Sequence, residues 1–177
     1  MRFSKDVKFK NLKPHIADAI KESCYRTDAR FYNIANEVHN IVTFSLEPGV
    51  EIAEGLSKII DKTIRESVAL GCDLSIIVKG ILIGTFRSTP SIAQEAHKTI
   101  RILITEILQS VFKYKGNLKE TIDGILSAII VAAHESKLNT QEAVVIVRED
   151  ILSSAKEISP EFGDNVKEAL HASNNSL

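Results

Sequence analysis

The sequence predicts an all-α protein, a multi-helix bundle of about eight helices in a single domain over residues 1–177. Apolar residues recur at helical spacing in successive segments, and the breaks between them carry capping residues, glycine or proline. A short hydroxyl–proline–polar–apolar phrase also occurs twice, around Pro90 and around Pro160. We therefore predict two similar three-helix units, about residues 50–104 and 118–171, preceded by an N-terminal helical pair. The likeness between the two units extends over residues 55–104 and 121–171.

The N-terminal part is predicted to hold a basic arm over residues 1–12 and a helical pair over residues 13–47. Pro14 suits the first turn of the first helix, where its missing N–H costs nothing. Asp28 can cap the second helix, and Pro48 with the glycine after it breaks the chain.

The first repeat unit, residues 48–115, is predicted to contain three helices: about Val50 to Leu70, Leu74 to Phe86, and Thr89 to Tyr114. Gly71 can end the first of these in the left-handed conformation, and Asp73 can cap the second. Apolar residues surround the second helix almost completely, which predicts burial on several sides. The third helix, ended by Gly116, has more apolar positions than one neighbour can cover, so it should be central or form a dimer interface.

The second repeat unit, residues 117–172, begins with a capping-box-like phrase at Asn117, has another at Asn139, and opens its last helix at Ser159-Pro160. β-Branched runs such as Val144 to Val147 would suit strands. The lengths of the segments and their caps favour helices instead.

Composition restricts the protein class. The formal net charge is -1 and 44% of residues are hydrophobic, which argues against a protein devoted to non-specific nucleic-acid binding. No apolar run is long enough for a transmembrane helix, and the charged N-terminus does not resemble a signal peptide, so we expect a cytoplasmic protein. Cys24 and Cys72 are interpreted as reduced thiols in a reducing compartment, since two cysteines alone do not establish a disulfide.

The sequence contains only weak motifs for catalysis or for binding a nucleotide or metal. The chain has no Gly-rich phosphate loop, and Gly80 with Gly84 indicates a close approach of two helices. His134 lacks the second histidine of a zinc protease motif, and the single Glu168–His171 pair predicts surface decoration. No catalytic residue, metal ligand or cofactor is therefore assigned.

Charge is distributed unevenly along the chain. Residues 1–13 carry a net charge of +4, whereas residues 139–177 carry -4. The basic arm has three interpretations: a solvated segment, docking onto the acidic C-terminal helices of the same or a neighbouring chain, or contact with an anionic membrane surface or nucleic acid. Its cationic residues are Arg2, Lys5, Lys8, Lys10 and Lys13.

Two functions remain open from the sequence. The leading hypothesis is a non-enzymatic helical interaction or scaffold protein that self-associates, with a dimer favoured and a protein partner also considered. The alternative is a small-molecule or metal-binding bundle, enzymatic or not, with a site between helices. Its polar residues to inspect are His39, His97, His134, Asp123 and Glu106.

Overall fold

A computed structural model describes residues 18, 20, 34–40, 52–88 and 96–173 of the chain. Within these ranges all regular structure is helical, which confirms the all-α prediction. Within the described residues the helices are α3 (Ile52–Ala69), α4 (Leu74–Ser88), α5 (Ala96–Tyr114), α6 (Leu118–Glu135), α7 (Thr140–Ile158) and α8 (Pro160–Ser173). The basic arm, most of the N-terminal pair and the predicted start of α5 at Thr89 lie outside the described residues. The total of eight helices therefore stays a prediction.

Polar side chains cap the starts of four helices as predicted. Asp73, Asn117, Asn139 and Ser159 directly precede α4, α6, α7 and α8. Each side-chain oxygen accepts a hydrogen bond from a first-turn backbone N–H, at 2.9 Å for Asp73, 3.2 Å for Asn117, 3.1 Å for Asn139 and 3.0 Å for Ser159. These bonds satisfy donors that have no partner within the helix, so the sequence itself fixes where each helix begins.

Three helices end in the same left-handed turn. Gly71, Lys115 and Lys137 have φ values of 66°, 55° and 57°. In each case the N–H of the next residue donates to the carbonyl oxygen five positions earlier, at 2.9–3.0 Å, which is the Schellman pattern. Gly71 confirms its prediction, but at the end of α5 the left-handed residue is Lys115 rather than Gly116. Gly116 is instead needed for packing, because a Cβ there would lie 2.8 Å from Leu74 Cδ1.

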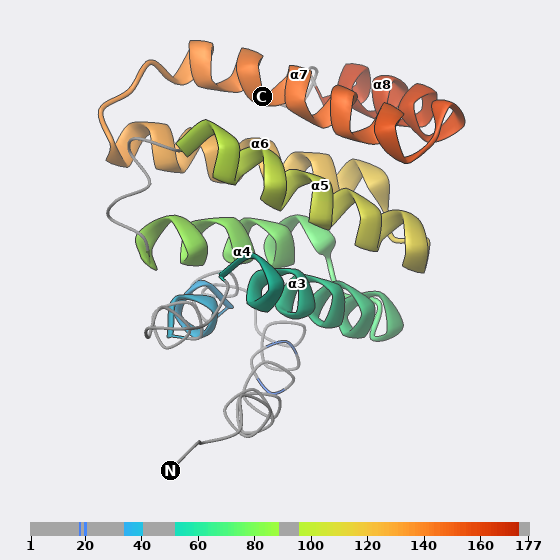
Figure 1. The fold of residues 1–177 in the computed structure, drawn as a ribbon, viewed down its shortest axis with the longest axis horizontal. Coiled ribbons are helices and arrows are strands. Elements are labelled where there is room, and N and C mark those ends of the chain that lie inside the picture. Colours follow the sequence, from blue (N-terminus) through green and yellow to red (C-terminus); the bar gives the residue numbers. More distant parts are fainter. Residues whose placement is uncertain (1–17, 19, 21–33, 41–51, 89–95, 174–177) are drawn as a thin grey trace.

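The helices are stacked in three layers, α3 with α4, α5 with α6, and α7 with α8 (Figure 1). Along one side of the stack α5 contacts both α3 and α7, and along the other α6 contacts both α4 and α8. Each layer thus packs on the next one, the arrangement of a helical solenoid.

The pattern of contacts between helices repeats every two helices. The caps Asp73 and Asn117 are 44 positions apart, and so are Tyr114 and Ile158, the last residues of α5 and α7. The predicted three-helix units, 50–104 and 118–171, would make α3 equivalent to α6, yet these two helices lie on different sides of the stack. The structure does not confirm those units, and its contacts follow the shorter period.

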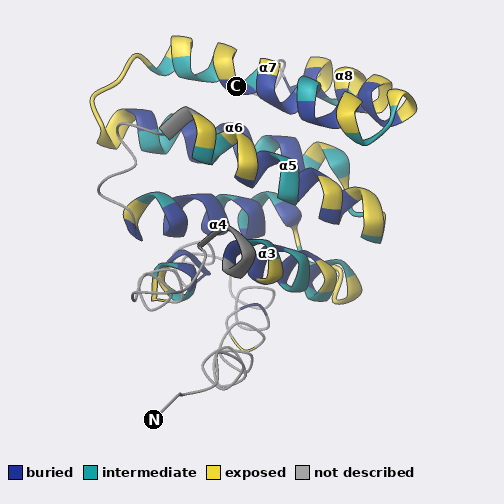
Figure 2. Cartoon of the chain, in the orientation of Figure 1, coloured by how far each residue is buried: buried dark blue, intermediate teal, exposed yellow. Residues whose placement is uncertain are grey.

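The core runs between the layers (Figure 2). Most of α4 is buried, as its nearly continuous apolar surface predicts. Helix α5 is central, because α3 and α7 cover its apolar stripe and leave its core residues no more than 1% exposed: Leu103, Ile104, Ile107, Leu108 and Val111. The central position predicted for this helix is confirmed. The β-branched run Val144–Val147 is helical, within α7.

Two glycines allow helices to approach closely. A Cβ on Gly84 would lie 2.8 Å from Val38 Cβ and closer still to the carbonyl oxygen of Ala35, both in the helical segment 34–40. A Cβ on Gly124 of α6 would lie 2.6 Å from the carbonyl oxygen of Ser75 on α4. The interpretation of a close helix approach is thereby confirmed at Gly84.

The interpretation of two reduced thiols is wrong, because Cys72 is disulfide-bonded. Cys72 lies half-buried in the turn between α3 and α4, where another segment can reach it. The chain has one other cysteine, Cys24, which lies outside the described residues. Disulfides persist mainly in oxidising compartments, so the expected cytoplasmic location gains no support from the cysteines. None of the described helices has the length and hydropathy required to cross a membrane.

Candidate functional site

The polar residues chosen from the sequence are dispersed over the stack. His39 lies in the helical segment 34–40, Glu106 on α5, and Asp123 and His134 on α6. His97 falls on α5, but its side chain is outside the description. Among the described residues, no three His, Cys, Asp or Glu side chains form a group able to hold a metal ion.

His39 makes a contact that the sequence did not predict, with Ser88 in the last turn of α4. The Ser88 hydroxyl lies 3.0 Å from His39 Nδ1 and donates to the carbonyl oxygen of Gly84 at 2.6 Å. The same hydroxyl also lies 3.2 Å from the carbonyl oxygen of His39. The pair thus ties segment 34–40 to α4.

Glu106 joins two layers. Its Oε2 accepts a hydrogen bond from the Ser57 hydroxyl of α3 at 2.6 Å. The next contact along α5 is of the same kind, with the Thr105 hydroxyl 2.8 Å from the Ser154 hydroxyl of α7. These polar side chains form hydrogen bonds between neighbouring layers, so they hold the layers in register.

Asp123, one of the polar residues chosen from the sequence, lies beyond the first turn of α6. The acidic residue in that first turn is Glu120. Asp123 lies a turn further on and forms an ion pair with Lys119 at 2.6 Å. This i, i+4 pair is half-exposed and offers a small contribution to helix stability.

Glu120 has a role that sequence reasoning recognised only in part. Its carboxylate accepts from Asn117 Nδ2 at 2.8 Å, and its other oxygen accepts from the backbone N–H of Leu74 at 2.9 Å. Leu74 is the first residue of α4, so one carboxylate serves the positive ends of two helices, α4 and α6. The phrase at Asn117 signalled the cap, whereas nothing in the sequence indicated the contact with α4.

Glu168 and His171 are exposed, as surface decoration predicts, and His134, a candidate for a site between helices, is exposed as well. His171 Nδ1 lies 2.7 Å from the carbonyl oxygen of Lys167 one turn before it, near the end of α8. Neither histidine gathers further metal ligands among the described residues.

The most connected polar cluster, around Asp61 on α3, was not predicted. Its carboxylate accepts from Lys113 Nζ at 2.9 Å and from the Tyr114 hydroxyl at 2.9 and 3.0 Å, both on α5. Partial burial acts to raise the pKa of Asp61, but the hydrogen bonds from Lys113 and Tyr114 outweigh it, so this pKa is lowered. The pKa of Lys113 is raised by its contact with Tyr114 and its bond to Asp61. The cluster clamps α3 to the end of α5.

No protein-family model matches the chain. No curated protein matches its sequence.

The surface of the last layer differs from the polar contacts just described. Leu138, in the turn before α7, is 65% exposed, and Val145 and Ile146 in the first half of α7 are 57% and 38% exposed. Large apolar side chains at the end of a stack leave a surface on which another element can pack. The arrangement therefore offers a contact surface at the start of α7.

Proposed function

We propose that the protein is a non-enzymatic helical interaction or scaffold protein that self-associates, with a dimer as the favoured assembly. The observation that carries this proposal is the exposure of Leu138, Val145 and Ile146 on the last layer of the stack. Terminal layers of solenoids ordinarily carry a polar outer face, and an apolar one favours a further partner.

The positions of the polar side chains also support a scaffold. Ser57–Glu106, Thr105–Ser154 and the Asp61 cluster all connect neighbouring layers. A scaffold of this kind binds through its surface, while its buried groups maintain the register of the layers.

Sedimentation velocity on the full chain over a range of concentrations tests the proposal. We expect twice the mass of one chain at high concentration and dissociation on dilution. The mass of a single chain at every concentration would refute self-association.

A pair of variants locates the interface. The double change Val145→Ser with Ile146→Ser should weaken the assembly, because it removes apolar area from the last layer. The control is Ile102→Ser, since Ile102 is 41% exposed on α5, the helix that the sequence offered as an alternative dimer interface. Dissociation by the control alone would place the interface on α5 instead.

A further inference from the structure

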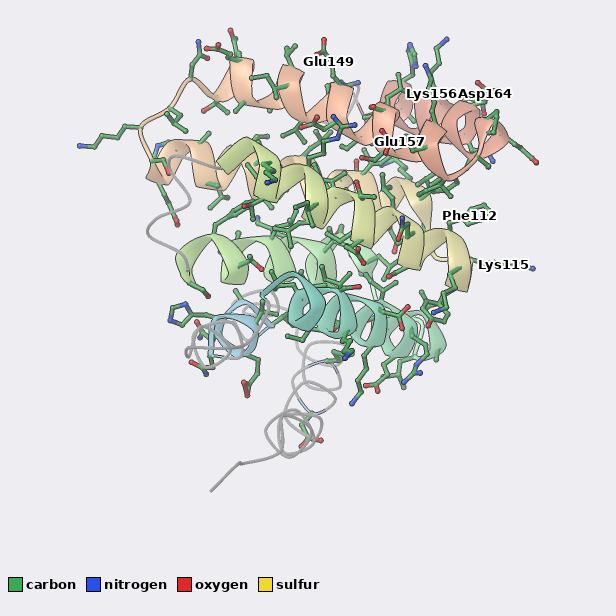
Figure 3. The ribbon with its side chains drawn as sticks, viewed as in Figure 1. Phe112, Lys115, Glu149, Lys156, Glu157 and Asp164 are labelled. Carbon is green, nitrogen blue, oxygen red and sulfur yellow. The ribbon has the colours of Figure 1, made fainter. Side chains whose placement is uncertain are left out.

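Four exposed residues form one surface of α7, which we name the α7 outer stripe: Glu142, Val145, Ile146 and Glu149. Their spacing of three, four and seven positions puts them on one face of the helix. Figure 3 shows Glu149 on the side of the layer away from α5. Acidic groups thus flank an apolar centre.

The two carboxylates of this stripe have no hydrogen bond or ion pair within the described part of the chain. Two other exposed glutamates are paired, Glu157 with Arg101 at 2.8 Å and Glu135 with Arg87 at 2.6 Å. The α7 outer stripe therefore combines two unpaired negative charges with two exposed apolar side chains.

A complementary segment exists in the same sequence. Residues 1–13 carry a net charge of +4 and interleave lysines with apolar residues, as in Lys5, Val7, Lys8 and Phe9. We propose that residues 1–13 of a second copy dock on the α7 outer stripe, with lysines on the two carboxylates and apolar side chains on Val145 and Ile146. This inference rests on the proposed self-association and names the surfaces that produce it.

The direction of the chain favours a second copy as the source of the arm. Segment 34–40 packs against α4, in the first layer, whereas the α7 outer stripe belongs to the last layer (Figure 1). The chain therefore enters the described fold at the end of the stack opposite to α7. Two copies that exchange arms reciprocally would form a closed dimer.

Charge reversal on the full chain tests the inference by sedimentation velocity. Glu142→Lys with Glu149→Lys should raise the dimer dissociation constant about tenfold or more, because it places lysine against lysine. Lys5→Glu with Lys8→Glu should have the same effect. The four changes together restore opposite charges, and the dissociation constant should return to within about threefold of the original.

The matched control is Asp164→Lys with Glu168→Lys. These two residues are exposed on α8, make the same change in net charge, and have no apolar neighbours like Val145 in the stripe. We expect this control to leave the dimer unchanged, and circular dichroism should show equal helix content in all variants.

The outcomes separate the two proposals. A dimer insensitive to both reversals, or equally sensitive to the α8 control, overturns the docking of the arm but leaves self-association intact. A dimer that both reversals weaken but the four changes do not restore also overturns the pairing. A single chain at all concentrations overturns both proposals.

Discussion

Replacement of Gly124 by alanine tests the contact between layers on which the whole stack depends. Gly124 is buried on α6, and a Cβ there would lie 2.6 Å from the carbonyl oxygen and 3.0 Å from the Cα of Ser75 on α4. Both atoms belong to backbone, so no side-chain rotation can relieve the contact. Helices α4 and α6 must separate by several tenths of an ångström or more.

The magnitude follows from two opposed effects. In a helix interior alanine is more favourable than glycine by about 1 kcal/mol. Overpacking of a well-packed core costs about 1 to 3 kcal/mol, and a backbone obstacle places Gly124→Ala toward the upper end. We expect a net loss of about 1 to 2 kcal/mol in the free energy of unfolding, or a melting temperature lower by about 2 to 8 °C.

Gly163 provides the matched comparison. It is also a buried helical glycine, on α8, and a Cβ there would lie 2.7 Å from Cγ of Lys156 and 3.3 Å from its Cα. Lys156 is exposed and can change rotamer, so the gain in helix propensity should cancel most of the cost of Gly163→Ala.

Urea unfolding followed by circular dichroism measures both variants against the original chain. The reasoning requires Gly124→Ala to be less stable than Gly163→Ala. If Gly124→Ala were as stable as the original protein, the close crossing of α4 and α6 would be refuted.

Three further changes probe the polar contacts. Glu120→Ala should lower the free energy of unfolding by about 1 to 2 kcal/mol, because two helix starts lose an acceptor; equal stability in urea would contradict that role. Cys72→Ser should cost about 2 to 4 kcal/mol by removing the disulfide of Cys72, and a reductant should lower the melting temperature of the original chain alone. Tyr114→Phe should cost about 1 kcal/mol at neutral pH. The pKa of Asp61 is lower in the folded state than in the unfolded chain. The ionised Asp61 therefore stabilises the fold at pH values above the ordinary carboxyl pKa, and this stabilisation is lost as the pH falls through the pKa of the folded state. Unfolding measured against pH should therefore show the Tyr114→Phe deficit shrinking in acid, and a constant deficit would count against the cluster.

Helix positions could be predicted from local signals. Asn117, Asn139 and Ser159 each place an acceptor beside the first turn of a helix, and the apolar spacing behind them is helical. The local signal was incomplete at the end of α5, where Gly116 was predicted to end the helix but the left-handed residue is Lys115. There the packing of Leu74 decides the position of the glycine, and that contact is not visible in sequence.

The repeat was misjudged for a related reason. The prolines at 90 and 160 suggested a long period, whereas the capping residues Asp73 and Asn117 are 44 positions apart and mark the shorter one. Capping residues mark where helices begin, and the contacts between helices repeat with the same period as these helix N-termini. The spacing of caps was therefore the better signal of the period.

Contacts between layers could not be predicted from local sequence patterns. Glu120 bonds to Leu74 across 46 positions, and Asp61 bonds to Tyr114 across 53. Such pairs depend on which helices are neighbours in the fold. Apolar periodicity in the sequence can place a polar residue beside an apolar stripe, but it does not identify the residue on another helix that it contacts. The candidates His39, Glu106 and Asp123 were polar groups of this kind, and each has a separate structural contact.

Light scattering on the full chain and on a chain lacking residues 1–12 tests the proposed function most directly. The account predicts a dimer for the full chain and a monomer of unchanged helix content without the arm. A monomer in both cases would contradict the proposed function. An equally stable dimer without residues 1–12 would contradict the docking of the arm and leave self-association intact.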